Sequence, residues 1–172
     1  MATAGQKYAG LVTGRSRFST VPIGSVAYGS MGTDTTLVAG TIYWAELHIP
    51  RVLSLTGAAV LNGGTVGTNN GLVGLYDSGG SLVANSALAG AVTASSNAFQ
   101  ARAFTAVYLA QPGRYWLAYQ ANGTTDTIRT IAVSTFIDAL TTSATGAFGT
   151  LTQMTVPTTI TADKGPIGYV YA

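Results

Sequence analysis

Glu46 and His48 are the first residues to consider for chemistry, because they are the only glutamate and the only histidine in the chain. They lie two positions apart in the segment 41–49, whose residue types are typical of a β-strand. Side chains at that spacing point to the same face of a strand, with Cβ atoms about 7 Å apart. A carboxylate beside an imidazole could act as a general acid and base, or supply half of a metal site. The alternative is the polar face of an exposed strand. We favour this alternative because no catalytic motif accompanies the pair.

The aspartates offer no further catalytic or metal-binding pattern. Asp34, Asp77, Asp126, Asp138 and Asp163 lie in or near turns, and no spacing pairs two of them as a glycosidase requires. Asp126 follows an Asn-Gly turn and could help to bind calcium, although a single acid in a turn usually caps backbone N–H groups. The chain has no cysteine, which excludes thiolate zinc sites and cysteine nucleophiles. The sequence therefore predicts no catalytic residue, no metal site and no cofactor, and a protein that is not an enzyme.

Composition indicates a surface of an unusual kind. Charged residues make up 8% of the 172 residues, against about 25% in an ordinary globular domain. Hydrophobic residues make up 47%, and the mean hydropathy is +0.34. Protein interfaces are depleted in charge in the same way. We therefore expect much of the surface to be covered by partner subunits.

Charge and apolar runs exclude two further classes of partner. The net charge is +2, and no cluster of lysines and arginines could follow a phosphate backbone, which argues against nucleic acid. No apolar run approaches the roughly 20 residues of a membrane span, which argues against a membrane protein. The N-terminal residues have no secretory pattern. The protein is thus expected to be made in the cytoplasm with no targeting signal of its own.

Short apolar runs separated by Gly, Pro and Asn turns predict strands throughout the second part of the chain. The clearest stretch is 71–85, which predicts a β-hairpin with Asp77 and Gly79 or Gly80 in its turn. The other expected strands are 41–49, 52–62, 98–109, 115–120, 128–133 and 167–171, with weak strands around 148–156. Residues 136–142 could form one helical turn. Strands at this spacing predict an all-β fold, a jelly-roll-like two-sheet β-sandwich over residues 40–172.

Residues 1–39 differ from this pattern and predict an extended N-terminal arm with a short strand near 17–21. Glycines recur in it, and its apolar residues follow neither a strand nor a helix period. It is too apolar for a solvating tail, so we expect it to order against a neighbouring subunit. Tyr8, Arg15, Arg17 and Phe18 are the residues predicted to contact that partner.

Aromatic residues alternate along two of the expected strands. Trp44 and Trp116, with Tyr43, Tyr115 and Tyr119, could form a platform on which a sugar stacks. Aromatic side chains at such positions more often pack between sheets. Core packing is therefore the favoured interpretation.

Several stretches together resemble the β-sandwich structural proteins of tailed bacteriophages. They are 43–46, 61–64, 75–85, 99–100, 104–105, 113–117 and 122–126. The resemblance covers roughly residues 40 to 133. Such proteins occur as capsid decoration (cement) proteins and as fibre or baseplate modules, and the family carries no catalytic residues to transfer.

The resemblance implies a structural virion protein on the capsid exterior. It would stabilise the phage head by bridging major capsid subunits, and its partners would be the major capsid protein and its own copies in a homotrimer. The alternative is a tail-fibre, baseplate or spike module that binds a host surface glycan through Trp44 or Trp116.

Overall fold

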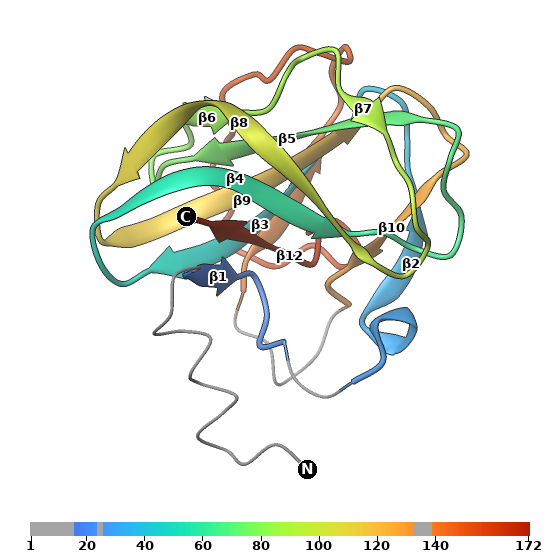
Figure 1. The fold of residues 1–172 in the computed structure, drawn as a ribbon, viewed down its shortest axis with the longest axis horizontal. Helices are drawn as coiled ribbons and strands as arrows, with labels where there is room; N and C mark the ends of the chain where they lie inside the picture. The colour runs from blue at the N-terminus through green and yellow to red at the C-terminus, as the bar shows by residue number, and fades with distance from the viewer. Residues whose placement is uncertain (1–15, 24–25, 133–138) are drawn as a thin grey trace.

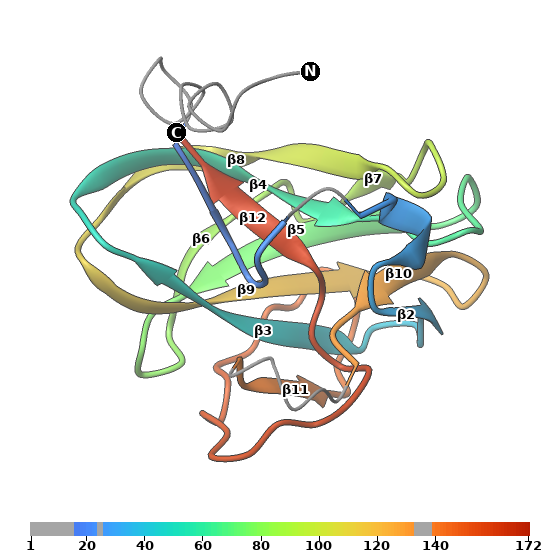
Figure 2. The ribbon, with the colours of Figure 1, turned by 90° about the horizontal axis from the view of Figure 1, so that it is seen from below.

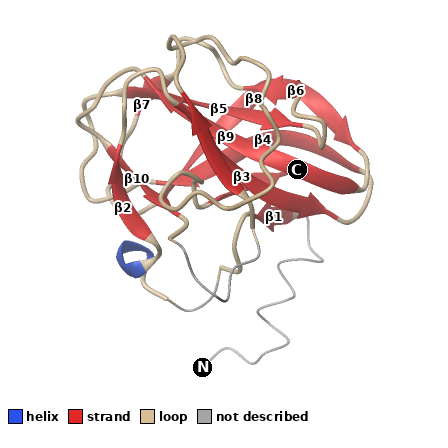
Figure 3. Ribbon diagram, turned by 180° about the vertical axis from the view of Figure 1, so that it is seen from behind, coloured by secondary structure: helices blue, strands red, loops and turns tan. Residues whose placement is uncertain are grey.

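The computed structural model describes residues 16–23, 26–132 and 139–172. Strands dominate these residues, and their one helix is a single 3-10 turn at Tyr28–Ser30 (Figure 3). Most of the strands form two antiparallel sheets that pack as a β-sandwich (Figure 1). In the part of the chain described, no helix is long and apolar enough to cross a membrane.

The first sheet contains four strands in the order β1-β12-β4-β8. They are β1 (Arg17–Ser19), β12 (Gly168–Tyr171), β4 (Leu53–Leu61) and β8 (Phe99–Ala110). β8 lies at the edge of this sheet and is the longest of the described strands, at 12 residues. Its register against β4 shifts between Leu55 and Gly57, which places a bulge of extra residues on β8.

The second sheet has the strand order β11-β3-β9-β5-β6, and β7 pairs with β5 beside this path. Its strands are β11 (Thr141–Ala144), β3 (Ile42–Ile49), β9 (Gly113–Ala121), β5 (Asn70–Tyr76), β6 (Leu82–Asn85) and β7 (Ala91–Val92). Figure 2 shows the two layers edge-on, with β4, β8 and β12 above β3, β5 and β9. The sandwich is therefore confirmed, while the jelly-roll strand order stays a prediction.

A two-stranded ribbon of β2 (Thr33–Thr36) and β10 (Thr127–Thr130) lies at one end of the sandwich (Figure 1). β1 pairs with β12, the last strand of the chain. The described residues of the expected arm are thus joined to the sandwich from residue 16 onward. Their pairing partners are more than 90 residues away in sequence, so no local pattern could reveal them. Residues 1–15 lie outside the described residues.

The main core fills the space between the two sheets. Tyr43, Leu47 and Ile49 of β3 pack there beside Leu117 and Tyr119 of β9. The first sheet contributes the buried side chains of Leu55, Ala58, Val60 and Val170. The alternation read from the sequence places Tyr115, Leu117 and Tyr119 on one face of β9, and all three belong to this core.

The outer face of the second sheet is covered by residues 139–163, which we call the cover segment. Met154 of this segment is buried against Trp44 and Trp116, and Leu140, Leu151 and Val156 pack around them. Polar bonds fasten the segment: the Gln120 amide donates to Ala147 O at 2.9 Å, and the Tyr76 hydroxyl donates to Thr152 O at 3.0 Å. The second sheet is therefore buried on both faces.

The cover segment differs from its prediction. The weak strands expected around 148–156 are absent from these described residues, which run as a loop, and the strand of this region is β11. Backbone groups of the cover segment form hydrogen bonds with the Gln120 side chain and with Gly80 O in the hairpin turn. The predicted helical turn at 136–142 falls partly outside the described residues, and Thr141 and Thr142 belong to β11.

The hairpin at 71–85 forms as predicted, from β5 and β6. Asp77 Oδ1 accepts hydrogen bonds from the backbone N–H groups of Gly79 and Ser81, both at 2.9 Å. Gly80 has a φ of 84°, which only glycine adopts without strain. The predicted strands 41–49, 52–62, 98–109, 115–120 and 167–171 also correspond to observed strands, whereas the strand predicted at 128–133 is β10, which ends at Thr130.

Candidate functional site

Glu46 and His48 lie on β3, where they pair in register with Trp116 and Arg114 of β9. His48 is exposed, whereas Glu46 is half-buried and its Oε2 accepts a hydrogen bond from Leu140 N at 3.1 Å. The carboxylate therefore fastens the cover segment to the sheet. In the described ranges, no three His, Asp or Glu side chains gather where they could hold a metal ion.

Asp126 is fully buried and holds loops together. Its carboxylate accepts hydrogen bonds from Thr68 N at 3.1 Å and from Asn69 N at 3.0 Å, and Thr93 donates its hydroxyl proton to the same group. Asn69 Oδ1 in return accepts the Asp126 N–H at 2.8 Å. Calcium requires a shell of oxygen ligands, whereas hydrogen-bond donors surround this carboxylate. The geometry is that of a loop anchor and does not fit a calcium site.

Asp34 and Asp77 also have structural partners, whereas Asp163 Oδ1 is buried without a hydrogen-bond partner. Asp34 lies 3.6 Å from the Arg129 guanidinium and accepts a hydrogen bond from Gly64 N at 3.0 Å. Asp77 organises the hairpin turn described above. Asp138 lies outside the described residues. The described aspartates thus give no paired carboxylates of the kind a glycosidase uses.

Trp44 and Trp116 do not reach the surface. Their exposed fractions are 1% and 0%, because the cover segment lies over them. The core interpretation of these aromatic residues is therefore the one that the structure supports. Stacking on a host glycan, the alternative role predicted for both residues, is incompatible with this burial.

Two of the four predicted partner-contact residues can be placed. Arg17 is exposed, with its guanidinium 4.8 Å from the ring centroid of Tyr169. Phe18 is half-buried and packs against the main core, so it is less available than Arg17. Tyr8 and Arg15 lie outside the described residues.

The most unusual surface of the molecule lies along β8. Six of its residues are exposed and none is charged, and we call them the β8 edge surface: Ala101, Ala103, Thr105, Ala106, Val107 and Leu109. Val107 is 65% exposed and Leu109 57%. Val52, in the turn before β4, adds a further apolar side chain that is 53% exposed. Beneath them Tyr108 packs edge-on against Tyr115, and burial raises the pKa of Tyr108 to about 12.

Natural edge strands are usually protected by charged side chains, prolines or bulges. β8 has the bulge, but its only charged residue, Arg102, is buried and faces the inside of the sandwich. Within the described residues, no second strand pairs with β8, and its contact with β6 includes the Thr105 hydroxyl, which donates to Asn85 O at 3.1 Å. The β8 edge is therefore suited to contact another protein. Sequence reasoning missed this surface, although a long strand with a single charge was a usable signal.

No protein-family model, no curated protein and no solved structure matches this chain. The residues and their geometry are therefore the support for any statement about function.

Proposed function

We propose that this chain is a structural virion protein, a capsid decoration (cement) protein that stabilises a phage head from outside. It binds major capsid subunits and its own copies, as a homotrimer, and bridges neighbouring subunits of the shell. Its activity is binding and not catalysis. The observation that carries the proposal is the β8 edge surface, a long edge strand whose exposed side chains are all uncharged.

Low charge elsewhere on the surface supports the same role. Among the described residues, the exposed lysines, arginines, histidines and acids are Arg17, Asp34, His48 and Arg51. Large apolar side chains are also exposed on other elements, including Val38, Leu88 and Val92. An uncharged surface loses little hydration energy when a partner covers it. Many weak contacts repeated by the symmetry of a shell then add up through avidity.

The test is cosedimentation of the purified chain with shells assembled from the major capsid protein of the same genome. The wild type is expected to saturate the shells at a fixed ratio. A variant carrying Val107→Lys and Leu109→Lys places two charges on the β8 edge surface, and we expect its binding to be at least about tenfold weaker.

The matched control carries Gln153→Lys and Thr155→Lys, two exposed positions of the cover segment. It adds the same charge on another part of the molecule and should bind like the wild type. The proposal is wrong if the wild type stays in the supernatant, and the β8 contact is wrong if both variants bind equally.

The role of the arm can be tested by a deletion that spares the strands of the sandwich. Removing residues 1–35 would delete β1, an edge strand of the first sheet, and most of β2 in the two-stranded ribbon. Removing residues 1–15 leaves all described strands in place. This shorter deletion is expected to weaken shell binding while the melting temperature stays near that of the full chain. Wild-type occupancy by the truncated chain would exclude a role for Tyr8 and Arg15.

A further inference from the structure

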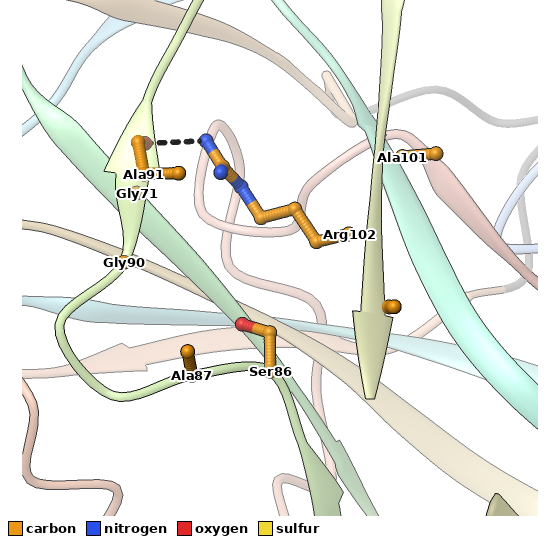
Figure 4. Close-up of a pocket in the computed structure, with 8 residues that line it drawn as sticks. Gly71, Ser86, Ala87, Gly90, Ala91, Ala101 and Arg102 are labelled. Atoms are coloured by element: carbon orange, nitrogen blue, oxygen red, sulfur yellow. Dashed lines mark hydrogen bonds between the residues drawn. The ribbon is translucent and has the colours of Figure 1, made fainter. Parts of the chain in front are cut away.

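A cavity of about 220 Å³ opens at the edge of the sandwich, between β8 and the segment that joins β6 to β7. Its walls are formed by small residues, among them Gly71, Ala87, Gly90 and Ala91. Arg102 is the only charged residue that lines it. Figure 4 shows the Arg102 side chain extending from β8 across the cavity toward Ala91.

The positive charge of the Arg102 guanidinium has no counter-ion among the described residues. The residue is 8% exposed, and its Nη2 donates a hydrogen bond to Ala91 O at 2.8 Å. Among the described residues, the one ion pair joins Arg129 to Asp34, so no described carboxylate neutralises Arg102. A guanidinium has five N–H donors, and no Arg102 nitrogen is both buried and without a partner, so the N–H groups that do not bond Ala91 O face the open cavity. An anion in the cavity could pair with this charge.

The surroundings select the kind of anion. A carboxylate matches the planar fork of a guanidinium with two parallel hydrogen bonds, and its single charge balances that of Arg102. Phosphate carries more charge and needs more donors, and besides Arg102 the lining offers only the Ser86 hydroxyl, which already donates to Val73 O at 3.4 Å. The cavity is also smaller than the roughly 300–1,000 Å³ of pockets for drug-sized ligands. Only a compact molecule or a single side chain fits.

Tyr119 lies next to Arg102 and Gly71, two residues that line the cavity. A side chain at Gly71 would collide with the Tyr119 hydroxyl, so glycine keeps both the cavity and the ring in place. That hydroxyl is buried beside the Arg102 guanidinium and makes no hydrogen bond of normal geometry. Burial raises the pKa of Tyr119 to about 12, while the nearby Arg102 charge opposes the rise. Arg102 is thus held between a neutral phenol and the open cavity.

We propose that this cavity binds a compact carboxylate, with the Arg102 guanidinium as its recognition group and the alanine and glycine walls around its alkyl part. The carboxylate comes from a small free acid or from an aspartate or glutamate side chain of a partner protein. The inference does not depend on the proposed role in a capsid, because it concerns binding by the isolated chain.

The test is a titration of the full-length chain with propionate at constant ionic strength, followed by calorimetry and by amide NMR shifts. Saturable binding is expected, with shifts at Gly71, Gly90 and Ala91. Arg102→Gln should weaken it by at least about tenfold. Arg51→Gln, which removes the same charge at an exposed position, should leave it unchanged.

Ala87→Leu provides a variant that keeps the charge. Ala87 is exposed and lines the cavity, so a larger side chain there narrows the cavity without entering the core. It should weaken propionate binding even if Arg102→Gln fails to fold.

A parallel titration with a blocked tripeptide containing one glutamate separates the two sources of the carboxylate. Binding of propionate alone indicates a free acid, and binding of the peptide indicates a protein side chain. The proposal is overturned if neither binds, or if Arg102→Gln and Ala87→Leu both bind like the wild type.

Discussion

Tyr119 is the residue at which burial and hydrogen bonding conflict most directly. Its ring belongs to the main core, yet its hydroxyl is buried beside Arg102 and makes no hydrogen bond of normal geometry. Tyr76 is equally buried, but its hydroxyl donates to Thr152 O. Burial is the main cause that raises the pKa of both tyrosines to about 12. The two residues therefore form a natural pair for a test of what an unpaired hydroxyl costs.

Tyr119→Phe is expected to leave the free energy of unfolding at pH 7 unchanged or higher, because it removes an unpaired polar atom and keeps the ring. Tyr76→Phe should instead lower it by about 1 kcal/mol through the lost hydrogen bond. Urea denaturation of both variants measures the difference. An equal loss in the two variants would show that the Tyr119 hydroxyl has a partner in solution.

The same residue predicts a pH dependence. A phenol is neutral when protonated, and its pKa is about 12 in the folded chain against about 10 when unfolded. The folded state therefore holds the proton more tightly, and this contribution is complete below about pH 10 and is lost as the pH rises through 12. Thermal melting between these pH values should fall less steeply for Tyr119→Phe than for the wild type. Parallel curves would contradict the assignment.

Among the elements, the 71–85 hairpin and the cover segment depend on each other. Met154 N donates to Gly80 O at 2.9 Å, which joins the hairpin turn to the cover segment. The sequence predicts the hairpin because turn residues and strand residues are close together. It does not predict the cover segment, because the apolar face that Met154 covers comes from strands far away in the chain.

Gly80→Ala should be much more destabilising than Gly79→Ala. An alanine at position 80 would have a φ of 84° and its Cβ would collide with the backbone O of Met154, whereas at position 79 the nearest atom is Asp77 Oδ1 at 3.4 Å. We expect a loss of about 1–3 kcal/mol for Gly80→Ala and less than about 0.5 kcal/mol for Gly79→Ala. Urea denaturation gives both values. Similar losses would mean that the turn adapts to either residue.

The cover segment can be tested through the tryptophans that it buries. Met154→Ala should cost about 2–4 kcal/mol and increase acrylamide quenching, because Met154 packs on Trp44 and Trp116. Thr155→Ala changes an exposed neighbour and serves as the control. Equal quenching in the two variants would show that Met154 does not protect the indoles.

For the whole molecule, the shortage of charge predicts how it associates. With 8% charged residues and a net charge of +2, binding through the β8 edge surface should depend little on electrostatics. Raising sodium chloride from about 0.1 to about 1 M should leave shell cosedimentation nearly constant, while added sulfate should strengthen it. A steep loss of binding with sodium chloride would instead point to an ionic contact such as Arg17.

Local signals in the sequence determine the strands, the turns and the all-β class. Turn chemistry at Asp77 and Gly80, and alternation along β3 and β9, act over a few residues and are therefore readable. The absence of cysteine and the scarcity of charge are equally visible. These features are enough to predict a sandwich with an uncharged surface.

Tertiary structure alone decides which surfaces remain open. It buries Trp44 and Trp116 under the cover segment, joins β1 and β2 to strands more than 90 residues away, and leaves β8 at an edge. It also turns Arg102 toward a cavity, although the sequence shows only one arginine in an uncharged strand. The physical reason is that burial depends on pairing between distant segments, and local patterns carry no information about which segments will meet.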